Sequence, residues 1–198
     1  LNNITPLIEA SQKGQTDTVK ILLEKGTDLN AKNINNWTAL MFATEKGHTD
    51  IVKMLLEKGT DVNAKDDNGY TALIIASYNK HTEIVRMLLE NGADVNMKDK
   101  YNHTALMFAI KHINHLEDSW ERYWFDTSGI VSMLLEKGAD VNAKDDWGRT
   151  ALMKAVARKG NIKTVVMLLE KGADVNAKDY NETTALMKVR GNYKYTEI

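Results

Sequence analysis

The chain has 198 residues, a formal net charge of −1 at pH 7 and no cysteine. Because the positive and negative charges nearly cancel, the composition offers no overall attraction to nucleic acid or to an anionic membrane. The lack of cysteine excludes disulfides, thiol catalysis and cysteine-based zinc sites. No apolar run approaches the roughly 18 residues of a membrane-spanning helix, so we expect no membrane association.

A block of sequence returns about every 33 residues along the chain. Copies of one threonine follow each other at spacings of 33, 33, 33, 46 and 34 residues. The ending Leu-Leu-Glu-Lys-Gly, or Leu-Leu-Glu-Asn-Gly in one copy, closes the first five copies. A fixed period of this length predicts an array of stacked units instead of one globular core. The marker threonines are Thr5, Thr38, Thr71, Thr104, Thr150 and Thr184.

The second copy indicates the structure of one unit. Thr38 is suited to cap the start of a helix over 39–46, and Gly47 is suited to end it in the left-handed conformation. Apolar residues at helical spacing over 49–58 predict a second helix with one apolar stripe. The segment 60–69 is rich in turn-forming residues. Each unit should therefore be a helix, a tight turn, a second helix and an extended hairpin-like loop.

Three motifs resemble those of ankyrin repeats. They are the Thr-Pro-Leu of 5–7 with the Thr-Ala-Leu of later copies, the Gly-Ala-Asp-Val-Asn of 92–96, 138–142 and 172–176, and the Asp-Asp-Asn-Gly-Tyr-Thr of 66–71. The resemblance implies an all-α repeat solenoid of helix–turn–helix units and hairpin loops, forming a single domain over 1–198. We expect five full repeats, at about 4–36, 37–69, 70–102, 103–148 and 149–182, and a partial sixth at 183–198.

One position departs from the family pattern in every repeat. Ankyrin repeats usually have a histidine after Thr-Pro-Leu, and this chain has an apolar residue there instead. The replacements are Ile8, Met41, Ile74, Met107, Met153 and Met187. We expect the start of each first helix to be more apolar as a result, without harm to the fold.

The sixth copy stops before the Leu-Leu-x-x-Gly ending of the others. An incomplete last unit exposes an apolar face unless something covers it. The sequence fits a shortened chain, a short natural cap or a face for self-association. We expect a monomer, with self-association through the incomplete repeat as the alternative.

The positions that vary between copies indicate a binding face. The resemblance implies that first helices and loops line a concave face, on which this family binds proteins through varied residues. Large aromatic residues gather at the varied positions here, and such residues give much contact area at little cost in entropy. We predict a partner-binding face made of Trp37, Phe42, Tyr70, Tyr78, Tyr101, His103, Phe108, Trp147, Arg149 and Lys154. The alternative is that some of these rings pack against a neighbouring loop.

The charge also changes along this predicted face. Glu9 and Glu45 lie at its start, whereas Arg149, Lys154 and Lys188 lie at its end. A ligand with an apolar middle and an acidic end would fit this order of charges.

The spacing of 46 residues contains an insertion over 113–128 in the fourth repeat. Its apolar residues recur at helical spacing and its local charge is negative, so it could be a protruding recognition element. It could equally pack back onto the fourth and fifth repeats, because exposed aromatic residues favour aggregation. The predicted epitope of the insertion is Trp120, Tyr123, Trp124 and Phe125.

No motif predicts catalysis, because the chain has no glycine-rich phosphate loop, no nucleophile motif and no HExxH. His112 and His115 have a spacing loosely like that of metal ligands, but such pairs are common by chance. We therefore expect a non-enzymatic module that binds a protein or peptide on the concave aromatic face, with no cofactor, metal or nucleic acid. The alternatives are binding through the insertion and a purely structural segment of a larger protein. We expect a cytoplasmic location, or export as an effector.

Overall fold

The computed structural model describes residues 4–110, 127–157 and 162–191. These residues form eleven helices and no strand, with one isolated bridge between Lys98 and Thr104. The expected all-α repeat solenoid is therefore confirmed. The helices are α1 (Pro6–Lys13), α2 (Thr16–Glu24), α3 (Ala39–Lys46), α4 (Thr49–Glu57), α5 (Ala72–Asn79), α6 (Thr82–Glu90), α7 (Ala105–Ile110), α8 (Ser128–Glu136), α9 (Ala151–Val156), α10 (Ile162–Glu170) and α11 (Ala185–Gly191).

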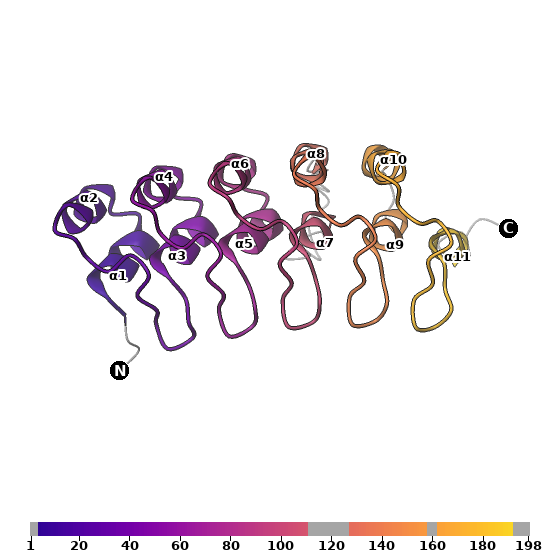
Figure 1. Ribbon diagram of the computed structural model, residues 1–198, viewed down its shortest axis with the longest axis horizontal. Helices are drawn as coiled ribbons and strands as arrows, with labels where there is room; N and C mark the ends of the chain where they lie inside the picture. The colour runs from indigo at the N-terminus through magenta and orange to yellow at the C-terminus, as the bar shows by residue number, and fades with distance from the viewer. Residues whose placement is uncertain (1–3, 111–126, 158–161, 192–198) are drawn as a thin grey trace, which may run out of the picture.

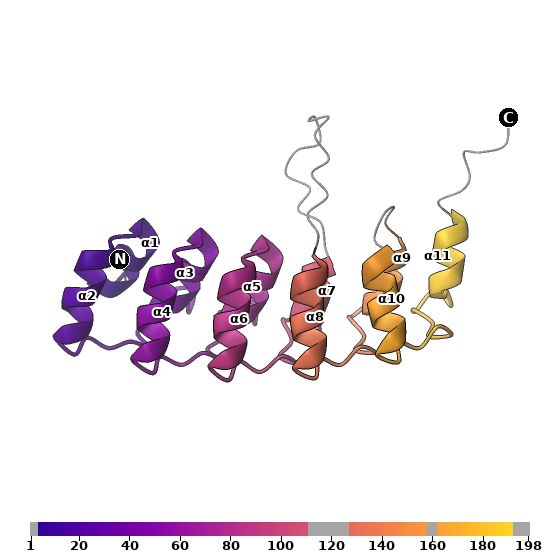
Figure 2. The ribbon, with the colours of Figure 1, turned by 90° about the horizontal axis from the view of Figure 1, so that it is seen from above.

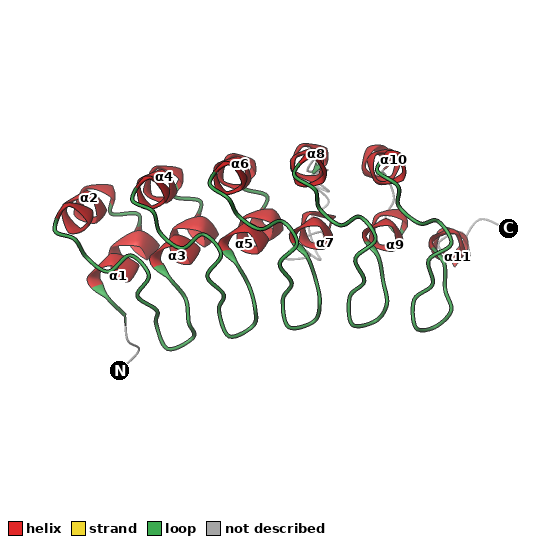
Figure 3. Cartoon of the chain, viewed as in Figure 1, coloured by secondary structure: helices red, strands yellow, loops and turns green. Residues whose placement is uncertain are grey.

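The helices lie in two parallel rows with a row of loops beside them (Figure 1). The odd-numbered helices are the first helices of their repeats, and the even-numbered ones are the second helices. The view from above shows the helix pairs following each other along one axis (Figure 2). All long loops extend to the same side of the array, next to the first helices (Figure 3). The first helices and the loops thus share one face, and the second helices form the opposite edge.

Local sequence signals account for the ends of the first helices. The hydroxyl of Thr38 accepts a hydrogen bond from the backbone N–H of Met41 at 3.3 Å, and Thr71 caps α5 in the same way. Gly47 ends α3 with a φ of 74°, which glycine adopts without strain. Lys80 takes the same conformation after α5, and its ammonium donates to the carbonyls of residues 108 and 109 at 2.9 and 2.6 Å.

Buried apolar residues of both helices of each repeat form the core, and the first helices contribute a leucine and the residue after it. The leucine after each Thr-Ala is at most 2% exposed in the second to fifth repeats, and so is the residue that follows it. The apolar residues at the family's histidine position are therefore core residues in these repeats. At the C-terminal end the equivalent Leu186 and Met187 are 68% and 55% exposed, and Leu169 of α10 is 42% exposed. This end presents an apolar face, and self-association through it stays a prediction.

A ladder of asparagine side chains joins neighbouring loops. The Oδ1 of Asn63 accepts from the backbone N–H of Asp94 at 2.8 Å, and its Nδ2 donates to the carbonyl of Gly92 at 3.3 Å. Asn96 and Asn142 make the same two bonds to the loops that follow them. These bonds fix the spacing between loops, so that the loop tips are positioned relative to each other.

Candidate binding face

A buried carboxylate organises every described loop on the shared face except the first. The Oδ1 of Asp66 accepts from the backbone N–H groups of Asn68 and Tyr70, both at 2.8 Å. Asp99, Asp145 and Asp179 make the same pair of bonds, and the amide Oδ1 of Asn33 makes them in the first loop. Each tight turn places the varied residue before the marker threonine where the loop meets the first helix.

In the loops that have an aspartate, the second carboxylate oxygen binds a residue at one of the varied positions. The indole Nε1 of Trp37 donates to Oδ2 of Asp66 at 2.9 Å, across to the next loop. The Nδ1 of His103 lies 3.0 Å from Oδ2 of Asp99. Two residues of the predicted face, Trp37 and His103, are thus held in place by buried acids of the fold itself.

In the last two loops the partner of this second oxygen is basic. Oδ2 of Asp145 lies 2.6 Å from the ammonium of Lys154 and 3.0 Å from Nε of Arg149, and Asp179 pairs with Lys188 at 2.8 Å. Burial alone would raise the pKa of Asp145, but the bonds from Lys154 and the backbone hold that pKa below its ordinary value. The hydrogen bond from Lys188 likewise lowers the pKa of Asp179. The basic side chains expected to meet an acidic ligand are therefore engaged with the protein's own carboxylates.

The aromatic residues form a row of ring contacts along the face. The ring of Phe108 lies 5.6 Å from that of Tyr70 and 5.9 Å from that of Tyr78, both edge to face, and 5.4 Å from the ring of His103. His103 stacks on Trp147 with 5.8 Å between centroids. Edge-to-face and offset contacts of this kind are favourable arrangements for aromatic rings. The structure thus brings the predicted aromatic residues of the third and fourth repeats together.

The rings differ in how far they are open to solvent. Phe108 is only 5% exposed, so it forms the floor of the row. Tyr101 and Trp147 are 42% and 47% exposed at the loop tips, and their rings lie 6.1 Å apart. The guanidinium of Arg149 lies 4.5 Å from the centre of the Trp147 ring. Phe42 is half-buried and packs on Trp37 with 4.9 Å between ring centroids.

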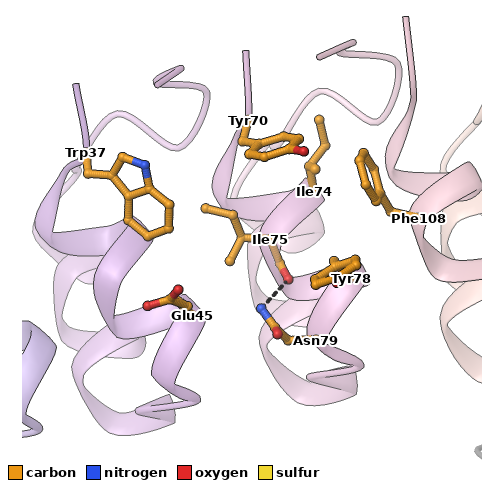
Figure 4. A pocket seen from close by; sticks show the side chains of 8 residues that line it. All are labelled: Trp37, Glu45, Tyr70, Ile74, Ile75, Tyr78, Asn79 and Phe108. Carbon is orange, nitrogen blue, oxygen red and sulfur yellow. Dashed lines mark hydrogen bonds between the residues drawn. The ribbon is translucent and has the colours of Figure 1, made fainter. Parts of the chain in front are cut away.

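A groove of about 290 Å³ lies between α3, α5 and α7 (Figure 4). Four of the predicted residues line it, together with Ile74 and Ile75, which are buried. Glu45 and Asn79, at the ends of α3 and α5, complete it and lie outside the predicted partner-binding set. The predicted residues in the lining are Trp37, Tyr70, Tyr78 and Phe108.

The predicted epitope of the insertion falls outside the described residues, as do the two histidines of loosely metal-like spacing. Among the residues that the structure describes, no three His, Asp or Glu side chains could together hold a metal ion. The residues outside the description include Trp120, Tyr123, Trp124, Phe125, His112 and His115.

Comparison with protein families decides the nature of the repeats. A family model of three ankyrin repeats matches residues 1–66 and 125–195, which together exceed half of the chain. The chain belongs to the ankyrin-repeat family. A model of many ankyrin copies matches residues 55–109, and one of a single ankyrin repeat matches 101–146. Ankyrin repeats are in general modules for protein–protein interaction.

A comparison of this ankyrin-repeat chain with curated proteins finds no match. Within the described part of the array, no helix is both long enough and apolar enough to cross a membrane.

Proposed function

We propose that this ankyrin array is a non-enzymatic module that binds a protein or peptide on the aromatic face, centred on the groove between α3, α5 and α7. The observation that supports the proposal most is the row of rings held in place before any partner arrives. Trp37 is fixed by its bond to Asp66, and Phe108 by its contacts with three other rings. A binding surface that is already ordered loses little side-chain entropy on association.

The surface also has the composition of a binding site. Protein interfaces are enriched in Tyr, Trp and Arg, and a few such residues carry most of the binding energy. The exposed rings of Tyr101 and Trp147 lie next to each other at the loop tips. The half-buried rings of Trp37, Tyr70 and Tyr78 surround the groove. A partner segment that crosses the face would contact both regions.

Capture of partners from a lysate of the source organism tests the proposal. We expect the triple variant Trp37→Ala, Tyr70→Ala, Trp147→Ala to lose most of the partner retained by the unchanged chain. A double variant, Ile21→Ala and Ile162→Ala, is the matched control, because these exposed apolar residues lie on second helices. Circular dichroism confirms that each variant is folded.

Equal capture by the triple variant would contradict the proposal. Deletion of 113–128 in parallel separates binding on the aromatic face from binding through the insertion. If the deletion removes the partner and the triple variant retains it, the insertion is the site.

A further inference from the structure

The groove between α3, α5 and α7 is lined by one charged side chain, which is acidic. Glu45 stands at the edge of the groove, below Trp37 in the close-up view (Figure 4). Its carboxylate pairs with Lys46 at 3.0 Å, but both side chains are substantially exposed. An exposed pair of this kind contributes little free energy and exchanges readily with other partners. The Glu45 carboxylate is therefore available to a cation that enters the groove.

Two buried carboxylates lie near residues that line the groove, Asp66 at Trp37 and both Asp66 and Asp99 near Tyr70. Asp66 receives hydrogen bonds from two backbone N–H groups and from the indole of Trp37, all of which are neutral. Among the described residues, neither Asp66 nor Asp99 pairs with a lysine or arginine, whereas Asp145 and Asp179 both do. Asp66 and Asp99 thus keep their charge without an ammonium partner among the described residues. The ammonium groups nearest the groove are those of Lys46, which pairs with Glu45, and Lys80, which binds the carbonyls of residues 108 and 109.

The phenol of Tyr70 lies close enough to Asp99 and Asp66 for their charges to act on its pKa. Burial raises the pKa of Tyr70, and the nearby charges of Asp99 and Asp66 raise it further. A negative potential disfavours the loss of a proton that leaves a second negative charge. The charges of Asp99 and Asp66, unlike burial, favour a positive group brought to that place.

The aromatic side chains offer their own attraction to a cation. Tyr70 and Tyr78 lie on either side of Ile75, opposite Trp37 and Glu45 across the hollow (Figure 4). The face of an aromatic ring carries partial negative charge, and tryptophan gives the strongest attraction to a cation. The bond from Trp37 to Asp66 removes the freedom of the indole to turn away.

We propose that this groove receives a basic side chain, arginine or lysine, from the protein segment that binds the aromatic face. Trp37, Tyr70 and Tyr78 contact the aliphatic stem and the cationic head, and Glu45 is the counter-ion. The inference rests on the proposed function and specifies the chemistry of the partner at its central site. A volume of about 290 Å³ is at the lower limit of pockets for whole small ligands, so it suits one side chain of a larger partner.

Other occupants fit the groove less well. An acidic side chain would be repelled by Glu45 at the edge and by Asp66 and Asp99 behind it. An aliphatic side chain would remove water from Glu45 without giving its carboxylate a partner, which costs free energy. At the groove the favoured ligand charge is thus positive, whereas the basic residues at positions 149, 154 and 188 suggest an acidic ligand group at the other end of the face.

A random 12-residue peptide display library is the probe for this test. The library is selected on the full chain, and bound clones are counter-screened on the triple aromatic variant to retain those that need the aromatic face. We expect every family of retained peptides to share an arginine or lysine. A synthetic copy of the strongest peptide is then titrated against the full chain, the Glu45→Gln variant and the Glu57→Gln variant. Glu57 is an exposed residue of α4 on a second helix, so its change alters the net charge equally without touching the groove.

We expect Glu45→Gln to weaken the synthetic peptide roughly threefold to tenfold and Glu57→Gln to leave its affinity unchanged. Replacement of the shared basic residue by glutamine or norleucine should weaken binding by about tenfold or more. Face-dependent peptides that share no basic residue, or equal affinity for both glutamate variants, would overturn the inference and leave the proposed function standing. A failure to recover any peptide that needs the aromatic face would overturn both.

Discussion

The hydrogen bond between Trp37 and Asp66 gives the sharpest test of how this face is built. We expect Asp66→Asn to destabilise the chain by about 2 kcal/mol, the scale of a hydrogen bond to a buried charged group. The turn itself should survive, because the amide oxygen of Asn33 already accepts the two equivalent backbone N–H groups in the first loop. The variant loses the carboxylate oxygen Oδ2, which accepts from the indole of Trp37 at 2.9 Å. The amide nitrogen of the new asparagine takes its place and faces the indole N–H, and neither of these groups can accept a hydrogen bond.

A double-mutant cycle isolates this interaction. Trp37→Phe removes the indole donor and keeps an aromatic ring, so Asp66→Asn should cost far less in that background. Urea unfolding followed by circular dichroism at 222 nm gives the four free energies, and we expect a coupling of about 1–2 kcal/mol. If the costs of the two changes simply add, the bond does not hold the ring, and Trp37 is oriented by its packing on Phe42 alone.

Three further changes test other parts of the structure by the same urea assay. The wild-type chain should have a larger free energy of unfolding than Asp145→Asn at neutral pH. This difference should shrink as the pH falls below about 4, because a carboxylate of lowered pKa loses its contribution only when it is protonated. A difference that does not change with pH contradicts this. Gly47→Ala should cost more than Gly59→Ala, since both have positive φ but only a Cβ at residue 47 would lie 3.0 Å from the imidazole of the next repeat; equal costs would show that this ring moves freely. Leu73→Ala should cost about 2–5 kcal/mol and Leu186→Ala less than about 0.5, because the first is 1% exposed and the second 68%; similar losses would mean that the C-terminal face is covered in solution.

The repeat pattern predicts the fold well because each signal recurs in several copies. Thr38 and Gly47 occupy the positions of cap and helix end that the sequence indicates for 39–46, and α3 has those bounds. The apolar replacements of the family histidine, such as Met41, are core residues for the same reason: the positions around them are fixed by the period. Agreement across copies makes an accidental match improbable. The copies agree because each unit must stack on its neighbours in the same way.

The partners of the charged residues at the varied positions could not be predicted in this way. The sequence presents Arg149 and Lys154 as positive charges on a binding face, and only the loop geometry brings them to Asp145. The sequence does contain one signal of these ion pairs: Asp179 and Lys188 have the same separation of nine residues as Asp145 and Lys154. Asn79 was missed because a polar residue at the end of a short helix usually faces solvent.

The residue that closes the turn of each loop is either aspartate or asparagine. Which of the two occurs depends on the partner of its second terminal atom, the one that does not accept from the backbone of the turn. Where that atom meets an indole, an imidazole or an ammonium, the residue is aspartate, as at 66, 99, 145 and 179. In the first loop the residues at the corresponding positions are Ile4 and Phe42, which have no side-chain donor, and Trp37, whose donor is bound to Asp66. Asn33 stands there, and it closes the turn without burying a charge.

The negative charge of the face is therefore set by the choice of partner as much as by the number of acids. A neutral donor stabilises a buried carboxylate and leaves its charge in place, whereas a lysine cancels that charge. The second loop uses the neutral indole of Trp37, and the groove with Glu45 lies beside it. The fold thus leaves the charge of Asp66 next to the ring of Trp37, in the groove where we propose that a basic side chain binds.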